Sequence, residues 1–119
     1  LVLSCPLTET TRGLIDTAAL EALPTDAIVV NVARGGVVDT DALVDALRSN
    51  AIHGAALDVT DPEPLPESHP LWGFENVFIT PHTAGHTPKY FERRAEILVA
   101  NLERVAETGT YDALQNQVV

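Results

Sequence analysis

Short apolar runs alternate along the chain with segments whose apolar residues recur every three or four positions. The apolar runs predict four buried strands, at residues 1–4, 27–32, 52–57 and 77–80. The helical periodicity predicts helices over residues 17–23, from Asp39 or Thr40 to about Ser49, and over about twenty residues beginning near Phe91. This alternation of strands and helices is typical of a parallel α/β sheet.

Capping and helix-breaking residues mark the ends of these elements. Thr8 and Asp16 are candidate helix N-caps, Pro24 ends the first helix, and Gly109 ends the last one. Prolines predict a stiff loop over residues 59–70. The last helix carries one apolar stripe, which we expect to pack in a core, in part against another domain or a second subunit: Phe91, Ala95, Leu98, Leu102 and Val105.

The strands are nearly all apolar, so we expect both faces of the sheet to be buried. Four parallel strands leave an exposed sheet edge, and the chain opens inside an apolar run, Leu1–Leu3, without a methionine. We therefore expect residues 1–119 to be the second half of a doubly wound domain from a longer chain. Residues 88–119 are expected to form a long helix and a tail that pack on a further domain of that chain.

Composition narrows the functional classes. The chain has 119 residues, 45% of them hydrophobic, and a net charge of −10, which argues against nucleic-acid and membrane partners. No apolar run reaches the roughly 18 residues of a membrane span. Cys5 is the single cysteine, so we expect no disulfide and a reducing, cytoplasmic location. All basic residues except Lys89 are arginines, which predicts a halophilic source; an ordinary acidic cytosolic protein is the alternative.

Chemically useful residues follow the predicted strands. Ligands of doubly wound folds bind at the carboxyl ends of the strands. There the chain places Cys5, then Arg34 with Gly35 and Gly36, then Asp58 and the loop of Glu63, then His82. An arginine can bind a carboxylate by two hydrogen bonds, a histidine paired with a carboxylate can transfer a proton, and glycines let a ligand approach the backbone. The set suits a small anionic substrate.

Three separated motifs in this order resemble the nucleotide-binding domain of D-isomer-specific 2-hydroxyacid dehydrogenases. They are Asn31-Val-Ala-Arg-Gly-Gly-Val-Val-Asp39, Gly54-Ala-Ala-Leu-Asp-Val59 with Glu63-Pro64-Leu65, and Asn76-Val-Phe-Ile-Thr-Pro-His-Thr-Ala-Gly85. Pro6-Leu-Thr8, Thr11-Arg-Gly-Leu-Ile-Asp16 and the tail Asn116-x-Val118 fit the same family. The resemblance covers nearly all of the chain and implies a Rossmann-type fold.

The resemblance also implies hydride transfer between NAD and a small 2-oxo or 2-hydroxy acid. It makes Arg34 the ligand of the substrate carboxylate, His82 the proton donor or acceptor, and Glu63 the partner that orients His82 and keeps it protonated. Asp58 would accept a hydrogen bond from the nicotinamide carboxamide. The implied cofactor-binding set is Cys5, Val32, Ala33, Arg34, Asp58, His82, Thr83, Ala84 and Gly85. Phosphoglycerate dehydrogenase and glyoxylate or hydroxypyruvate reductase are the subtypes considered, and the resemblance also implies a homodimer.

Two features of the family are missing from the chain. It contains neither the glycine-rich G-x-G-x-x-G fingerprint nor the acidic residue that binds the adenosine ribose, so NADP stays open beside NAD. We expect the fragment alone to be inactive and to bind NAD weakly or not at all. The alternatives are an NAD(H)-sensing, corepressor-like interaction protein and a purely structural domain. We expect no metal site, because Pro88 opposes the helix that a His82–His86 pair would need.

Overall fold

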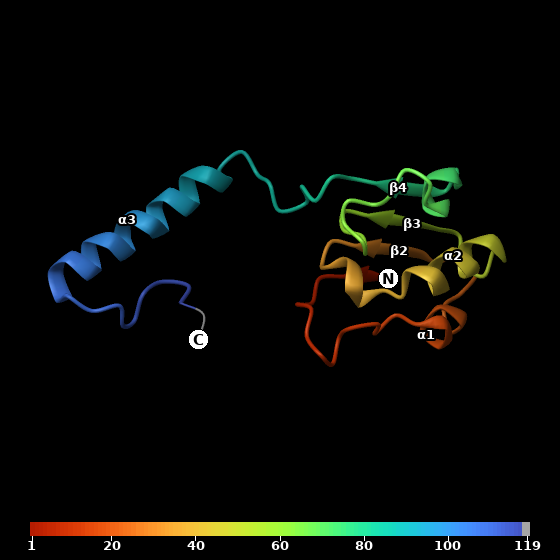
Figure 1. Ribbon diagram of the computed structural model, residues 1–119, viewed down its shortest axis with the longest axis horizontal. Helices are drawn as coiled ribbons and strands as arrows, with labels where there is room; N and C mark the ends of the chain where they lie inside the picture. Colours follow the sequence, from red (N-terminus) through yellow and green to blue (C-terminus); the bar gives the residue numbers. More distant parts are fainter. Residues whose placement is uncertain (118–119) are drawn as a thin grey trace. The chain divides into compact units, whose positions relative to one another are not determined.

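The computed structural model describes residues 1–117. They divide into two compact units, residues 1–84 and residues 85–117. Among the described residues, no helix has both the length and the apolar character needed to cross a membrane. Figure 1 shows the sheet with its helices in the first unit and one long helix in the second.

The first unit is built on a parallel sheet of four strands, as predicted. The strands follow the order β1-β2-β3-β4. The register pairs Leu3 with Asn31, Asn31 with Leu57, and Leu57 with Ile79. These pairs align the carboxyl ends of all four strands at one edge of the sheet, where the candidate residues follow. The strands are β1 (Val2–Leu3), β2 (Ile28–Asn31), β3 (Gly54–Leu57) and β4 (Val77–Ile79).

Side-chain caps begin the two helices of this unit. The Asp16 carboxylate accepts a hydrogen bond from Ala19 N and begins α1 (Thr17–Glu21). Asp39, rather than Thr40, caps α2 (Thr40–Arg48). The predicted cap at Thr8 is wrong: its hydroxyl bonds the hydroxyls of Thr10 and Thr11 in a turn, which competes with a helix. The prediction also omitted two 3₁₀ helices, η1 (Gly35–Val37) and η2 (Pro70–Gly73).

Only one face of the sheet is buried in the first unit, which corrects the expected burial of both faces. The other face carries the exposed side chains of Val2, Ile28 and Phe78. Val2 and Ile28 each precede a buried residue, and Phe78 lies between two partly buried ones, because successive side chains of a strand point to opposite faces. The core packs α1, α2 and the loops onto the buried face, and its largest members are Leu20, Val29, Val37, Leu43, Ile52 and Leu71.

The second unit contains α3 (Tyr90–Thr108), which ends at Gly109 as predicted. Gly109 adopts a left-handed φ of 68° and donates its N–H to Val105 O, an arrangement that glycine accommodates without strain. The expected core stripe is not buried: the exposed fractions of Phe91 and Leu102 are 74% and 60%. The stripe stays exposed because the described residues of this unit provide no second helix or sheet to cover it. The predicted tail motif extends to Val118, which lies outside the described residues.

Candidate active site

The carboxyl-end edge of the sheet brings the sequence-predicted residues into neighbouring positions. Cys5 follows β1, Val32 to Arg34 follow β2, Asp58 follows β3, and Pro81 to Ala84 follow β4. Glu63 lies in the loop after β3. The remaining predicted residue, Gly85, belongs to the second unit.

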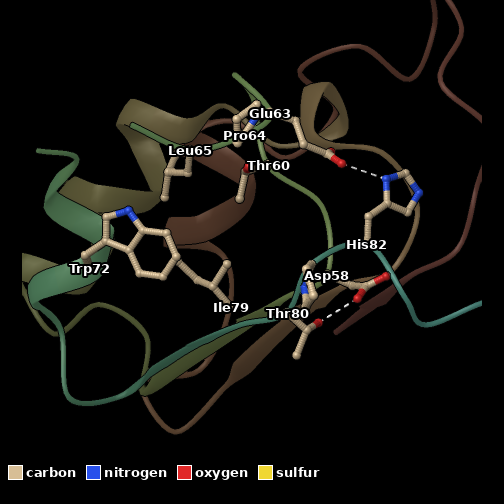
Figure 2. A pocket seen from close by; sticks show the side chains of 10 residues that line it. Asp58, Thr60, Glu63, Pro64, Leu65, Trp72, Ile79, Thr80 and His82 are labelled. Carbon is tan, nitrogen blue, oxygen red and sulfur yellow. Dashed lines mark hydrogen bonds and ion pairs between the residues drawn. The ribbon is translucent and has the colours of Figure 1, made fainter. Parts of the chain in front are cut away.

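Glu63 and His82 form a direct pair. Glu63 Oε1 lies 2.7 Å from His82 Nδ1, and 46% of the His82 side chain and 42% of the Glu63 side chain are exposed. Figure 2 shows this contact and the second ring nitrogen on the far side of the imidazole. With Nδ1 held by the carboxylate, Nε2 is free to exchange a proton with a bound molecule.

A buried carboxylate holds the turn that carries His82. His82 has a left-handed φ of 55°, a conformation that costs free energy in a non-glycine residue and needs support from its surroundings. Asp58 provides that support. One of its oxygens accepts hydrogen bonds from Thr80 Oγ1 at 2.6 Å and Thr83 N at 2.9 Å, and the other accepts one from Ala84 N at 2.8 Å. Thr80 before His82, and Thr83 and Ala84 after it, are thereby fixed to the residue that follows β3.

The same contacts determine the charge of Asp58. Burial raises the pKa of this carboxyl, but the hydrogen bonds from Thr80, Ala84 and Thr83 and the nearby His82 charge together hold it below its ordinary value of 3.8. Asp58 is therefore ionised at neutral pH although it is buried. Thr80 was not among the sequence-predicted site residues, and its place two residues before His82 in the quoted motif was the available signal.

The Arg34 turn is held by Asn31, a second residue that the sequence analysis missed. Asn31 is buried; its Nδ2 donates to Arg34 O and its Oδ1 accepts from Ala33 N, both at 3.0 Å. The signal was a polar residue at the end of an apolar strand. The Arg34 guanidinium donates to Ala33 O at 2.7 Å and is otherwise exposed. Among the described residues, no hydrogen bond joins it to Glu63 or His82, so it is open to an anionic ligand.

A cavity of about 560 Å³ adjoins the Glu63–His82 pair. Figure 2 shows the charged residues at one side of this space and Leu65, Trp72 and Ile79 at the other. Its volume lies within the roughly 300–1,000 Å³ of small-molecule sites. No group of three or more His, Cys, Asp or Glu side chains suited to a metal ion occurs within residues 1–117.

The residues that follow β1 to β3 fit the nicotinamide end of a dinucleotide. Val32 donates its N–H to Leu3 O at 3.2 Å and exposes 40% of its surface, which offers an apolar side chain at the ends of β1 and β2. The Asp58 oxygen bound only to Ala84 N keeps one lone pair for a carboxamide N–H. The sequence contains no glycine-rich fingerprint for the pyrophosphate, so the fit covers only part of the cofactor.

Comparison with protein families gives a direct result. Residues 1–84 match the family model described as "D-isomer specific 2-hydroxyacid dehydrogenase, NAD binding domain". The chain belongs to this family. The match confirms the resemblance that the three motifs suggested. It also confirms the Rossmann-type fold and NAD(P) as the cofactor class.

Individual dehydrogenases of the family agree with this assignment. The chain is 46% identical over 114 residues to a glyoxylate reductase of Thermofilum pendens, covering 96% of this chain and 34% of that protein. It is 42% identical over 87 residues to the human glyoxylate reductase/hydroxypyruvate reductase, covering 73% of this chain and 26% of that protein. These enzyme names do not favour the corepressor-like alternative.

A solved structure extends the agreement to the fold. The D-isomer specific 2-hydroxyacid dehydrogenase of Xanthobacter autotrophicus Py2, in complex with NADPH and MES, has a TM-score of 0.85 and 45% sequence identity. The alignment covers 99% of this chain and 47% of that one. The chain spans little more than a third of the length of the curated relatives that it matches most fully.

Proposed function

We propose that these 119 residues are the second half of the cofactor domain of an NAD(P)-dependent D-2-hydroxyacid dehydrogenase. The observation that carries the proposal is the 2.7 Å contact between Glu63 and His82. Both residues lie at the carboxyl-end edge of the sheet, where Arg34 is also exposed. A proton-transfer group and an exposed guanidinium at the same edge of the sheet are what reduction of a 2-oxo acid requires. The partial coverage of the relatives supports a longer chain.

Each residue has a separate task in this reaction. Arg34 binds the substrate carboxylate through two parallel hydrogen bonds and fixes the carbonyl next to it. His82 Nε2 gives its proton to the carbonyl oxygen as that oxygen becomes a hydroxyl, and takes the proton back in the reverse direction. Glu63 orients the ring through its contact with Nδ1.

NAD(P)H, when bound, supplies the hydride to the carbonyl carbon. We propose that the backbone and side chains of Cys5, Val32, Ala33 and Arg34 line its nicotinamide end. Asp58 then has two tasks, since it holds the His82 turn and offers its remaining lone pair to the carboxamide. Thr83, Ala84 and Gly85 complete the proposed cofactor-binding set.

For the substrate we propose glyoxylate or hydroxypyruvate. Support comes from the names of the relatives from Thermofilum pendens and human. A phosphoglycerate dehydrogenase from Lactobacillus plantarum is a weaker guide, with a TM-score of 0.71 and 39% identity. The decisive assay measures NADH and NADPH oxidation by the full-length protein that carries these residues, with glyoxylate, hydroxypyruvate and phosphohydroxypyruvate. Turnover of the phosphorylated acid alone would contradict the substrate assignment.

We also propose a halophilic, cytoplasmic and homodimeric parent protein. The net charge of −10 with a single lysine supports the salt requirement, the lone cysteine supports a reducing compartment, and the family resemblance supports the dimer. Moving the protein from molar KCl to dilute buffer is expected to reduce its circular dichroism, because the charge repulsion is then unscreened. Full retention of the signal would contradict the salt requirement, and a monomeric mass in sedimentation would contradict the dimer.

A further inference from the structure

Gly35 packs against the loop that carries Glu63. Gly35 is buried directly after Arg34, in the turn that follows β2. A methyl group built on its Cα would overlap the carbonyl carbon and oxygen of Thr60 and would lie 2.6 Å from Asp61 N. The obstacle is backbone, which cannot rotate away as the end of a side chain can. The sequence suggested that this glycine makes room for a ligand, whereas the group that approaches it is the chain's own loop.

The loop is held on the same side by hydroxyl hydrogen bonds. Thr40 Oγ1, at the start of α2, donates to Asp61 O at 3.1 Å. Thr60 Oγ1 donates to Pro62 O at 2.9 Å, one residue before Glu63. Thr60 and Asp61 therefore pack against Gly35 and the first residue of α2, and the Thr60–Pro62 bond joins them to the residue before Glu63.

The position of this segment decides whether Glu63 reaches His82. The Glu63–His82 contact measures 2.7 Å, and such a bond weakens beyond about 3.2 Å. A side chain at Gly35 pushes Thr60 and Asp61 away from the turn, and Glu63 lies only two residues after Asp61. Packed backbone transmits such a displacement because the interior has little free space.

We propose that Gly35 is a positioning residue that acts through Glu63. Its missing side chain lets the Arg34 turn and the Glu63 loop meet, and this contact sets the carboxylate at hydrogen-bond distance from His82 Nδ1. Gly35 thereby links the turn that carries Arg34 to Glu63, the partner of His82. The importance of this link for catalysis rests on the proposed function, but the link itself is a property of the folded chain.

Gly36 provides a matched control. A methyl group on Gly36 would lie 3.2 Å from Arg12 Nη1 and from Asp61 Oδ2, and 3.4 Å from a Leu7 methyl carbon. The two closest neighbours are the ends of flexible side chains, which can move by a few tenths of an ångström. The substitutions Gly35→Ala and Gly36→Ala therefore add the same group to adjacent residues, and only the first displaces the backbone of the Glu63 loop.

The test is the tautomer of neutral His82 in the ¹⁵N-labelled full chain, without cofactor or substrate. A carboxylate at Nδ1 selects the Nδ1–H form, and the ¹⁵N shifts of the ring nitrogens report its ratio to the Nε2–H form. Glu63→Gln gives the reference ratio without the carboxylate. Gly35→Ala is expected to lower the ratio toward that reference by about tenfold, and Gly36→Ala to change it by less than about twofold. Gly35→Ala in the Glu63→Gln background is expected to add nothing.

A folded Gly35→Ala chain with the parent ratio would overturn the proposal, and so would an equal change in Gly36→Ala. If Gly35→Ala does not fold, Thr40→Val replaces it, because it removes the hydrogen bond to Asp61 O without adding bulk. A change toward the Glu63→Gln ratio supports the proposal, and an unchanged ratio overturns it. Since no turnover is needed, absence of dehydrogenase activity would count against the proposed function and leave this result intact.

Discussion

Glu63 Oε1 and His82 Nδ1 lie 2.7 Å apart, although the two residues are separated by 19 positions and belong to different loops of the sheet edge. The contact exists because β3 and β4 are parallel neighbours whose ends are in register. Two different supports hold it. Asp58 fixes the His82 turn, and the contact of Gly35 with Thr60 places the loop of Glu63.

Replacing Glu63 by Gln is expected to lower ketone reduction at neutral pH by about tenfold. The reason is that the amide does not orient the ring as a carboxylate does. The measurement is the pH profile of NADH oxidation by the full-length protein. Glu67→Gln, an exposed change in the same loop, serves as the control and should keep the parent profile. Identical profiles for the parent and Glu63→Gln would reject the pairing.

Asp58→Asn is expected to destabilise the fold in a pH-dependent manner. The pKa of Asp58 lies below 3.8 in the folded chain, so its ionised form stabilises the native state. That contribution is complete above the pKa of the unfolded carboxyl and disappears as the pH falls through the lower pKa of the folded one. The difference in melting temperature between parent and variant should therefore be largest near neutral pH and shrink below pH 3.8.

The control for Asp58 is Asp45→Asn. Asp45 pairs with Arg48 at 3.5 Å on the surface, where both side chains are largely exposed and such pairs contribute little. Its melting temperature should follow that of the parent at every pH. An Asp58→Asn difference that stays constant between neutral pH and strong acid would show that the carboxylate charge does not stabilise the His82 turn.

Arg34→Lys is expected to raise the KM for the 2-oxo acid by about tenfold to a hundredfold, because an ammonium cannot make two parallel hydrogen bonds to a carboxylate. Steady-state kinetics with the full-length protein test this. Arg48→Lys on the exposed end of α2 is the matched control. A KM for Arg34→Lys equal to that of the parent would remove the arginine from carboxylate binding.

Asp39→Ala is expected to lower the free energy of unfolding by about 1 kcal/mol, since it removes the cap that accepts from Ala42 N. Chemical denaturation measures the change. Asp41 lies two residues further along and does not make that bond. Asp41→Ala should therefore lower the free energy of unfolding by less. An equal loss in both variants would show that helix-dipole charge, rather than the capping hydrogen bond, explains the effect.

The strands, the helix N-caps at Asp16 and Asp39 and the end of α3 at Gly109 could be predicted because each depends on local chemistry. An apolar run, a short acceptor side chain and a glycine after a helical pattern are all visible in the sequence. Thr8 failed as a cap because neighbouring threonine hydroxyls bond it in a turn. Burial of both sheet faces failed because no segment within residues 1–84 packs over Val2, Ile28 and Phe78.

The functional residues themselves were suggested by the motifs, but their supports depend on contacts between distant segments. Asn31 and Thr80 read in the sequence as ordinary strand-end residues, and only the fold shows what they hold. Gly35 was interpreted as room for a ligand, since nothing in the sequence places Thr60 against it. Asp58 appeared as a cofactor residue, while its three hydrogen bonds to the His82 turn arise from the register of β3 and β4.

The central claim is that His82 transfers the substrate proton in a D-2-hydroxyacid dehydrogenase. The most direct measurement is NADH oxidation with glyoxylate and hydroxypyruvate by the full-length protein in molar KCl, comparing the parent with His82→Ala and with His53→Ala. The account predicts turnover by the parent and by His53→Ala, whose ring is exposed away from the site residues. It predicts a loss of at least about a hundredfold in His82→Ala. Turnover that survives in His82→Ala would contradict the claim.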